Sequence, residues 1–158
     1  MTFAVVRIRS SVHVKDDIRE TMELMHLNRA NHCALLWDSP QNKGMLNKAK
    51  DYITWGEVDA ATLAKVIKAR GQLAGRKPIT DEYVKANSKF KDINEFAQQI
   101  SAGKARLKDL KDAKPLIRLH PPVKGYEGIK RSYRNGGALG YRGKDINALL
   151  LRMLMVVD

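Results

Sequence analysis

Few residues of this 158-residue chain could bind a soft metal ion, because it has one cysteine and four histidines. His32 and Cys33 are neighbours in a segment typical of a strand, where successive side chains point to opposite faces, so they could not share one ion. The paired-cysteine and paired-histidine spacings of zinc sites do not occur. We therefore predict no metal site. A single cysteine also excludes an intramolecular disulfide and is typical of a reducing cytosol.

The serines, histidines and acidic residues do not form a recognisable catalytic set. Ser10 lies near His13 in the sequence, but the Gly-x-Ser-x-Gly elbow of a nucleophilic serine is missing. The acidic residues between positions 16 and 23 spread around an expected helix, whose first turn they favour through the helix dipole. Residues 136–140 are glycine-rich but lack the spacing of a nucleotide-binding loop. We predict that the protein is not an enzyme and uses no cofactor.

The strongest chemical signal is a basic, glycine-rich stretch from residue 123 to residue 144. It holds six of the chain's 11 glycines, interleaved with lysines, arginines and tyrosines. Glycine lets backbone amides approach phosphates, basic side chains neutralise phosphates, and tyrosine rings stack on exposed bases. The stretch therefore predicts an RNA-binding segment. The alternative interpretation of the same composition is a flexible, solvated loop.

The charge of the whole chain also favours binding to a polyanion such as RNA. With 29 Lys and Arg against 17 Asp and Glu, the net charge is +12, which predicts attraction to polyanions. The excess grows along the chain, from +3 in residues 1–70 to +4 in residues 71–114 and +5 in residues 115–158. Charge alone does not separate nucleic acid from an anionic membrane surface. No apolar run approaches the ~20 residues of a membrane span, and the start lacks a signal-peptide pattern, so we expect a soluble, unexported protein.

The first 70 residues must form the scaffold, because they alternate strand and helix signals with nearly balanced charge. Strands are predicted at residues 3–9, 32–37 and 52–56. Between them, one helix begins near residue 16, and a second begins where Ser39 can cap it and Pro40 can take its first position. In that second helix, Gly44 is small enough for a close backbone approach. Asp59 is expected to cap a third helix, which ends at Gly71.

The rest of the chain has weaker signals. Thr80 is expected to cap a helix, and Asp92 with Glu95 resembles a capping box. Residues 104–114 are charged, and only two leucines, at 107 and 110, can anchor them. Residues 116–120 alternate like a strand, and an apolar helix from residue 145 to about 153 can pin the tail onto the core. We expect the core to fold alone and residues 123–144 to stay unprotected without RNA.

Six segments together resemble a known family. They are FAVVRIRS at residues 3–10, DSP at 38–40 with KGM at 43–45, ITWGEV at 53–58, LAG at 73–75, LHPP at 119–122 and GGALGYR at 136–142. On these segments the chain resembles the archaeal form of the large-subunit ribosomal proteins of the L-thirty family, relatives of bacterial L-thirty and eukaryotic L-seven. The resemblance covers nearly the whole length, whereas the short bacterial form matches only residues 1–58. Residues 131–133 and 154–158 depart from the family pattern.

The resemblance implies an α+β fold: a β-α-β-α-β core with a three-stranded sheet and two helices on one face, plus a helical and extended C-terminal region. The expected parts are the core at residues 1–58, a helical extension at 59–114, and a basic glycine-rich RNA-binding extension at 115–158 that ends in a short helix. The implied function is a structural constituent of the large ribosomal subunit in the cytoplasm. Its partners would be large-subunit ribosomal RNA, including the small ribosomal RNA of that subunit, and neighbouring ribosomal proteins, with no membrane.

The positions expected to contact RNA are basic or aromatic residues of the matching motifs and of the basic stretch: Arg7, Arg9, Lys43, Arg118, His120, Lys124, Lys130, Arg131, Arg134, Tyr141 and Arg142. Their mechanism would be neutralisation of phosphates and shape matching of folded RNA. Two alternatives remain at this point: a free-standing RNA- or DNA-binding regulatory protein, and a small enzyme acting on RNA.

Overall fold

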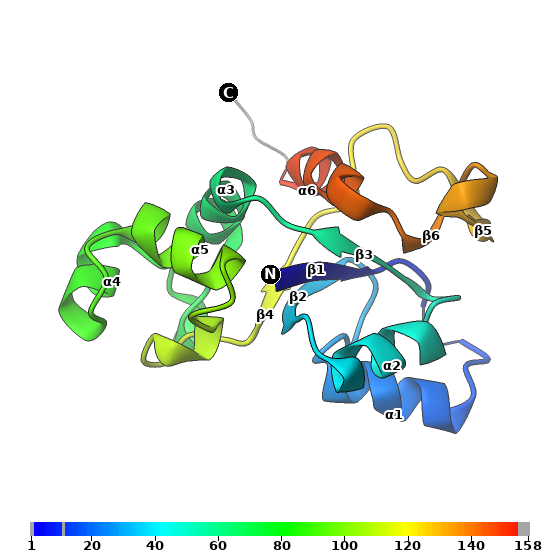
Figure 1. Ribbon diagram of the computed structural model, residues 1–158, viewed down its shortest axis with the longest axis horizontal. Helices are drawn as coiled ribbons and strands as arrows, with labels where there is room; N and C mark the ends of the chain where they lie inside the picture. Colours follow the sequence, from blue (N-terminus) through cyan, green and yellow to red (C-terminus); the bar gives the residue numbers. More distant parts are fainter. Residues whose placement is uncertain (1, 11, 155–158) are drawn as a thin grey trace.

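The centre of the fold is an antiparallel sheet of three strands, β1 (Thr2–Arg7), β2 (His32–Trp37) and β3 (Ile53–Glu57), with β1 in the middle. The computed structural model describes residues 2–10 and 12–154. Between these strands run α1 (Asp16–Leu24) and α2 (Pro40–Lys48), which lie together on one face of the sheet (Figure 1). The predicted β-α-β-α-β beginning of the chain is therefore confirmed.

The sheet is larger than the three strands that we expected. Within the described residues it has six strands in the order β4-β2-β1-β3-β6-β5. The added strands are β4 (Leu116–Arg118), β5 (Gly128–Ser132) and β6 (Gly137–Tyr141). β4 pairs antiparallel with β2, whereas β6 runs parallel to both β3 and β5. The C-terminal region therefore extends the sheet at both ends.

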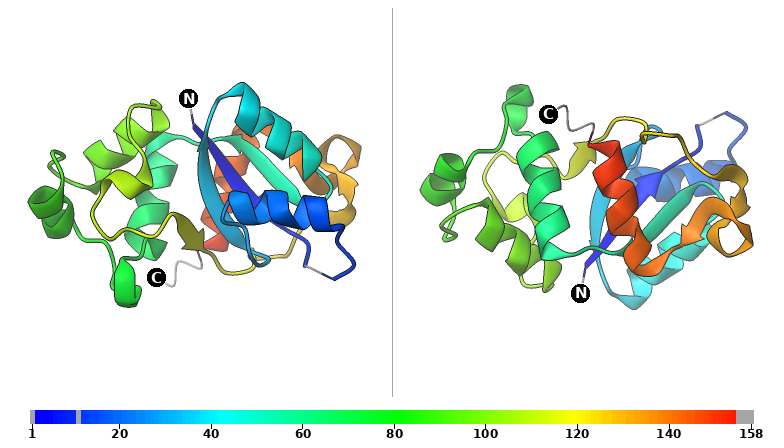
Figure 2. Two further views of the ribbon diagram at one scale, coloured as in Figure 1. Left: turned by 90° about the horizontal axis from the view of Figure 1, so that it is seen from below. Right: turned by 90° about the horizontal axis from the view of Figure 1, so that it is seen from above.

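Helices cover both faces of this sheet, not one. The second face carries α6 (Ile146–Met153), and α3 (Ala60–Arg70) packs against α6 and β4; α5 (Ile93–Ser101) packs against α3, and α4 (Asp81–Asn87) lies farther out against α5 (Figures 1 and 2). The side chains of β1 alternate between the two faces of the sheet. Phe3 and Val5 pack toward α1 and α2, and Ala4 and Val6 pack toward the other helices. All six residues of β1 are buried. No helix in the described ranges is long and apolar enough to cross a membrane.

Local capping signals predicted the helix starts well. The Ser39 hydroxyl accepts a hydrogen bond from the backbone N–H of Asn42 at 3.2 Å, with Pro40 in the first helical position. Thr80 likewise accepts from the Tyr83 N–H, and Asp92 accepts from the Glu95 N–H at 2.8 Å. The Glu95 carboxylate accepts from the N–H of Lys91 rather than from Asp92, so only half of the expected capping box forms. Asp59 precedes α3 but makes no side-chain cap.

The glycine-rich stretch is not the free loop that its composition suggested. Gly137, Ala138 and Leu139 in β6 are buried, and Ala138 and Leu139 form an apolar cluster with Ile8. The loop before β5 is also attached, because the Tyr126 hydroxyl donates to the Asn31 side chain at 2.6 Å. By contrast, β5 is exposed along its whole length. The alternative of an unstructured, solvated loop is therefore wrong for this segment.

Two glycines of the core differ sharply in how much room they have. A Cβ atom at Gly56 in β3 would lie 1.9 Å from the carbonyl oxygen of Gly143, so the chain after β6 can pass this point only because Gly56 has no side chain. Gly44 in α2 has nothing within 4 Å of such a Cβ. Among the described residues, nothing approaches Gly44 closely, contrary to our expectation. A close backbone approach occurs at Gly56 instead.

We predict opposite effects of the same substitution at these two glycines. Gly56→Ala forces the backbone around Gly143 to move and should lower the free energy of unfolding by about 1–3 kcal/mol. Gly44→Ala, in an exposed turn of α2, should raise it by about 0.5–1 kcal/mol, because alanine favours the helix. Urea denaturation of both variants measures the two effects. A Gly56→Ala protein as stable as the wild type would contradict the packing described here.

Candidate nucleic-acid interface

Two of the eleven expected RNA contacts are buried, and Arg7 is the first. It ends β1, and the residue is 1% exposed. Its Nη1 donates to the carbonyl oxygen of Leu27 at 2.7 Å, and its Nε donates to that of Arg9 at 3.0 Å. Burial lowers the pKa of Arg7, while the nearby Glu23 carboxylate acts in the opposite direction. In this conformation the guanidinium holds the segment after α1 against the sheet and does not reach the surface.

Arg142 is the second buried arginine, with 6% of the residue exposed. Its Nε donates to the Thr54 hydroxyl on β3 at 2.8 Å, and its Nη2 donates to the carbonyl oxygen of Ala138 on β6 at 2.7 Å. The guanidinium carbon also lies 4.9 Å from the centre of the Tyr133 ring. Arg142 therefore joins β3, β6 and the turn before β6, and it fixes the positions of these three segments relative to one another.

Four of the expected contacts are displayed at one end of the sheet, and we call them the basic tip. Lys130 and Arg131 lie on the exposed strand β5, and Arg134 lies in the short turn that follows it. Arg9 follows β1, whose end lies beside β6 because Ile8 packs against Ala138 and Leu139; Arg9 is half-buried, and its guanidinium carbon lies 5.2 Å from the centre of the Tyr52 ring. The tip combines four positive charges with two nearby carboxylates, Glu127 before β5 and Asp145, which accepts a hydrogen bond from the Tyr133 hydroxyl, so a net positive charge remains that suits a phosphate backbone.

Lys43 and Tyr141 lie together at a second place. They line a hollow of about 330 Å³ with Trp55, Asp38 and Glu57 among its walls. The Lys43 ammonium is 3.1 Å from the Asp38 carboxylate, and the Tyr141 hydroxyl donates to the Glu57 carboxylate. That hydrogen bond raises the pKa of Tyr141 and fixes its ring, which is 46% exposed. The ring can therefore serve as a stacking platform.

Three further expected contacts lie around the other edge of the sheet. Arg118 is exposed on β4, and Lys124 is exposed in the loop beyond it. His120 is half-buried, and its backbone N–H donates to the carbonyl oxygen of Met153 in α6 at 3.1 Å. Because β4 and β5 are the two outer strands, these residues and the basic tip belong to opposite edges. The structure therefore distributes the predicted contacts over separate surfaces.

Arg106 is a surface cation that the sequence did not single out. Its guanidinium carbon lies 3.8 Å from the centre of the Trp37 ring, although the two residues are far apart in the sequence. The sequence presents residues 104–114 only as a charged stretch. A cation–π contact between a strand and a distant loop leaves no local signal, because it depends on tertiary packing.

Among the described residues, no group of three or more His, Cys, Asp or Glu could hold a metal ion.

His32 faces Arg118 across the β2–β4 pair and is 9% exposed. Burial and then the positive charges of Arg118, Arg29 and Arg7 lower the pKa of His32 below its usual 6.5. Its Nδ1 has no hydrogen-bond partner among the described residues. The folded protein therefore favours the neutral imidazole more strongly than the unfolded chain does.

The lowered pKa of His32 predicts a pH dependence of stability. Above about pH 6.5 the imidazole is neutral in both states, and the full stability is present. As the pH falls below that value, the unfolded chain takes up the proton first, so the free energy of unfolding decreases. Urea denaturation at pH 7.5 and 5.0 should show a smaller loss for His32→Gln than for the wild type, with exposed His13→Gln as the control. Equal losses in all three proteins would contradict this role.

Arg142 and Arg134 should behave differently when each is replaced by glutamine. Arg142→Gln leaves the Thr54 hydroxyl and the Ala138 carbonyl without their charged donor, so the free energy of unfolding should fall by about 2 kcal/mol or more. Arg134→Gln removes an exposed charge and should change it by less than about 0.5 kcal/mol. Thermal and urea denaturation compare the two. A similar small effect in both would show that the buried guanidinium does not hold β3 and β6 together.

Comparison with known proteins agrees with the expected family. The family model described as ribosomal protein L30p/L7e matches residues 3–53. The large ribosomal subunit protein uL30 of Methanobrevibacter smithii is 51% identical over 152 residues, which is 96% of this chain and 99% of that protein. The proteins of the same name from Methanoregula boonei and Archaeoglobus fulgidus are 49% and 48% identical, again over 96% of this chain and 99% of theirs.

These matches extend far beyond the residues 3–53 of the family model, through the helical middle segment and the glycine-rich stretch. They confirm the resemblance to archaeal members, and with it a ribosomal protein rather than an enzyme. The chain belongs to the ribosomal protein L30p/L7e family.

Proposed function

We propose that this protein is a structural component of the large ribosomal subunit, where it binds and stabilises folded ribosomal RNA. The observation that carries the RNA-binding part is the basic tip. Arg9, Lys130, Arg131 and Arg134 are outside the core; Arg9 follows β1, and the other three lie on a strand and a turn that are attached to the sheet through β6. The names of the relatives, large ribosomal subunit protein uL30, support the location in the large subunit.

The mechanism would be electrostatic and would involve no chemical turnover. Lysine and arginine at the tip neutralise phosphates and release counterions, which gives affinity without sequence readout. β5 is an outer strand, and among the described residues it pairs in the sheet with β6 alone, so its other backbone edge also faces outward. Backbone N–H groups on that edge can donate to phosphate oxygens, because they have no strand partner. Sequence preference would come from RNA shape.

The second edge of the sheet supports contact with a second RNA segment. Arg118, His120 and Lys124 lie around β4, on the far side of the sheet from the tip. A protein with basic groups on two opposite edges can bridge two RNA segments and hold them at a fixed spacing. We propose that one of these segments belongs to the small ribosomal RNA of the large subunit. The exposed ring of Tyr141 would add a stacking contact to an unpaired base.

We predict that RNA binding depends steeply on salt and that the basic tip carries much of this dependence. A triple variant, Lys130→Gln, Arg131→Gln and Arg134→Gln, should reduce the slope of log affinity against log salt by about 2–3 units, since each phosphate contact contributes about 0.7–0.9. Filter binding to large-subunit ribosomal RNA at several salt concentrations measures the slope. The control is Lys65→Gln, Lys68→Gln and Lys85→Gln, which removes three exposed charges from α3 and α4.

The triple variant and its control separate a specific surface from general charge. If both reduce the slope equally, the tip has no special role and the protein binds RNA through its overall charge of +12. If neither reduces it, Lys130, Arg131 and Arg134 do not make the phosphate contacts that we propose for the tip.

The alternative function, a free-standing regulatory protein that binds RNA or DNA, predicts a different distribution in the cell. A ribosomal protein should sediment with large subunits through a moderate-salt gradient. The basic-tip triple variant should shift toward the free fractions, and its control should not. Wild-type protein found mainly in the free fractions would favour the regulator and contradict the structural role.

A further inference from the structure

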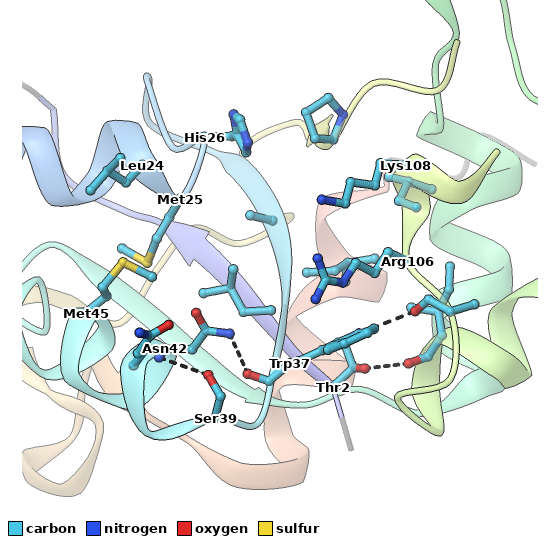
Figure 3. A pocket seen from close by; sticks show the side chains of 18 residues that line it. Thr2, Leu24, Met25, His26, Trp37, Ser39, Asn42, Met45, Arg106 and Lys108 are labelled. Atoms are coloured by element: carbon cyan, nitrogen blue, oxygen red, sulfur yellow. Dashed lines mark hydrogen bonds between the residues drawn. The ribbon is translucent and has the colours of Figure 1, made fainter. Parts of the chain in front are cut away.

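A groove of about 480 Å³ lies along the outer side of β2, between α1 and α2 on one side and residues 105–108 on the other (Figure 3). Its floor is the last part of β2, from Ala34 to Trp37. None of the residues predicted to contact RNA lines this groove. The groove is therefore a surface separate from the predicted RNA contacts.

The floor of the groove has an edge with which no strand of the described residues pairs beyond Ala34, although the Trp37 carbonyl oxygen accepts a hydrogen bond from the Asn42 side chain at 2.8 Å. β4 pairs with β2 only as far as Ala34, which faces Leu116, whereas β2 continues to Trp37. The residue before Leu116 is Pro115, which has no N–H to donate to a further rung of the ladder. Within the described ranges, no strand pairs with this side of Leu35–Trp37. Such an edge is a template for an added strand.

The two walls of the groove differ in character, and the first carries apolar side chains. Ala34 and Leu36 of β2 pack on the side of α1 and α2. On that side Leu24, Met25 and Met45 form the apolar part of the wall, beside the polar side chains of Ser39, Gln41 and Asn42, and Leu24 is strongly exposed, at 73%. Figure 3 shows the three apolar side chains along the α1 and α2 side of the groove. A phosphate would find no hydrogen-bond donor on these three side chains, whereas an apolar side chain would be buried there.

The opposite wall is basic. Trp37 points to this side, and its Nε1 donates to the carbonyl oxygen of Ala105 at 3.4 Å. Arg106 stacks over the Trp37 ring, and the exposed Lys108 follows two residues later. Both cationic side chains point toward the groove in Figure 3. A carboxylate in the groove would therefore have two cations within reach on this side.

We propose that the groove binds an extended peptide segment of a neighbouring protein, which adds a strand to the free edge of β2. Side chains of an added strand alternate between the two faces of the sheet, so the segment would alternate apolar and acidic residues. Its apolar side chains lie against Leu24, Met25 and Met45, and its carboxylates lie against Arg106 and Lys108. This interaction is independent of the RNA contacts, because it uses none of their residues.

The test is an NMR titration of the intact ¹⁵N-labelled protein with an acetylated and amidated pentapeptide, Glu-Leu-Glu-Leu-Glu. We expect saturable shifts of the backbone amides of Leu35–Trp37 and slower amide exchange there. Lys108→Glu should weaken the binding at least fivefold, because it replaces attraction by repulsion. Lys111→Glu makes the same charge change at an exposed lysine outside the groove and should leave the binding unchanged. Leu24→Asp, on the apolar wall, should also weaken it.

Three results would overturn the proposal. One is the absence of shifts at Leu35–Trp37 with peptide up to about 5 mM, a concentration that detects weak complexes. Another is equal binding of Glu-Glu-Glu-Leu-Leu or Lys-Leu-Lys-Leu-Lys, because the alternation or the charge would then not matter. The third is displacement of the peptide by a uridine pentanucleotide that produces stronger shifts at the same amides, which would assign the groove to RNA.

Discussion

The buried guanidinium of Arg142 is the interaction on which the C-terminal half of the sheet depends. A buried charge is tolerated only when hydrogen bonds satisfy it, and Arg142 finds its acceptors on β3 and β6 at once. Thr54 takes part twice, because its hydroxyl also donates to the carbonyl oxygen of Gly140. Next to this contact, the Asn147 side chain accepts from the N–H of Asp59 and donates to the carbonyl oxygen of Glu57. Polar side chains thus join α6 and β6 to the core, where the β3–β6 ladder is short.

The glycines of the last third serve this packing rather than flexibility. β5 and β6 are parallel neighbours in the sheet although only four residues separate them, so these residues must carry the chain back to the level of Gly128, where β5 begins. Gly136 ends the turn with φ +80°, a conformation that favours glycine. A Cβ atom at Gly137 would lie 2.1 Å from the carbonyl oxygen of Arg131, so the two strands approach more closely there than any side chain allows. The same residues that suggested a mobile loop are therefore required for an ordered one.

The sequence predicted those features that depend on neighbours in the chain. The caps at Ser39, Thr80 and Asp92 are local hydrogen bonds, and the three core strands have their own alternation, so both could be read from short segments. Whether an arginine is buried cannot be read from a short segment. Arg7 and Arg9 occupy equivalent positions of one alternating segment, yet Arg7 is buried because its acceptor is the carbonyl oxygen of Leu27, 20 residues away. Arg142 is likewise set apart from the other basic residues of its stretch only by tertiary partners.

An ordered basic edge has a consequence for how the protein would bind RNA in the proposed role. Binding by a flexible tail loses the conformational entropy of the segment that becomes ordered, whereas the basic tip is already attached through β6, Arg142 and Tyr133. More of the electrostatic free energy then remains as affinity. The sheet also fixes the separation between the tip and the residues around β4, because β2, β1, β3 and β6 lie between the two outer strands. Two RNA segments bound at these edges would be held at a fixed distance from each other. In this way the protein would stabilise the folded structure of a ribonucleoprotein.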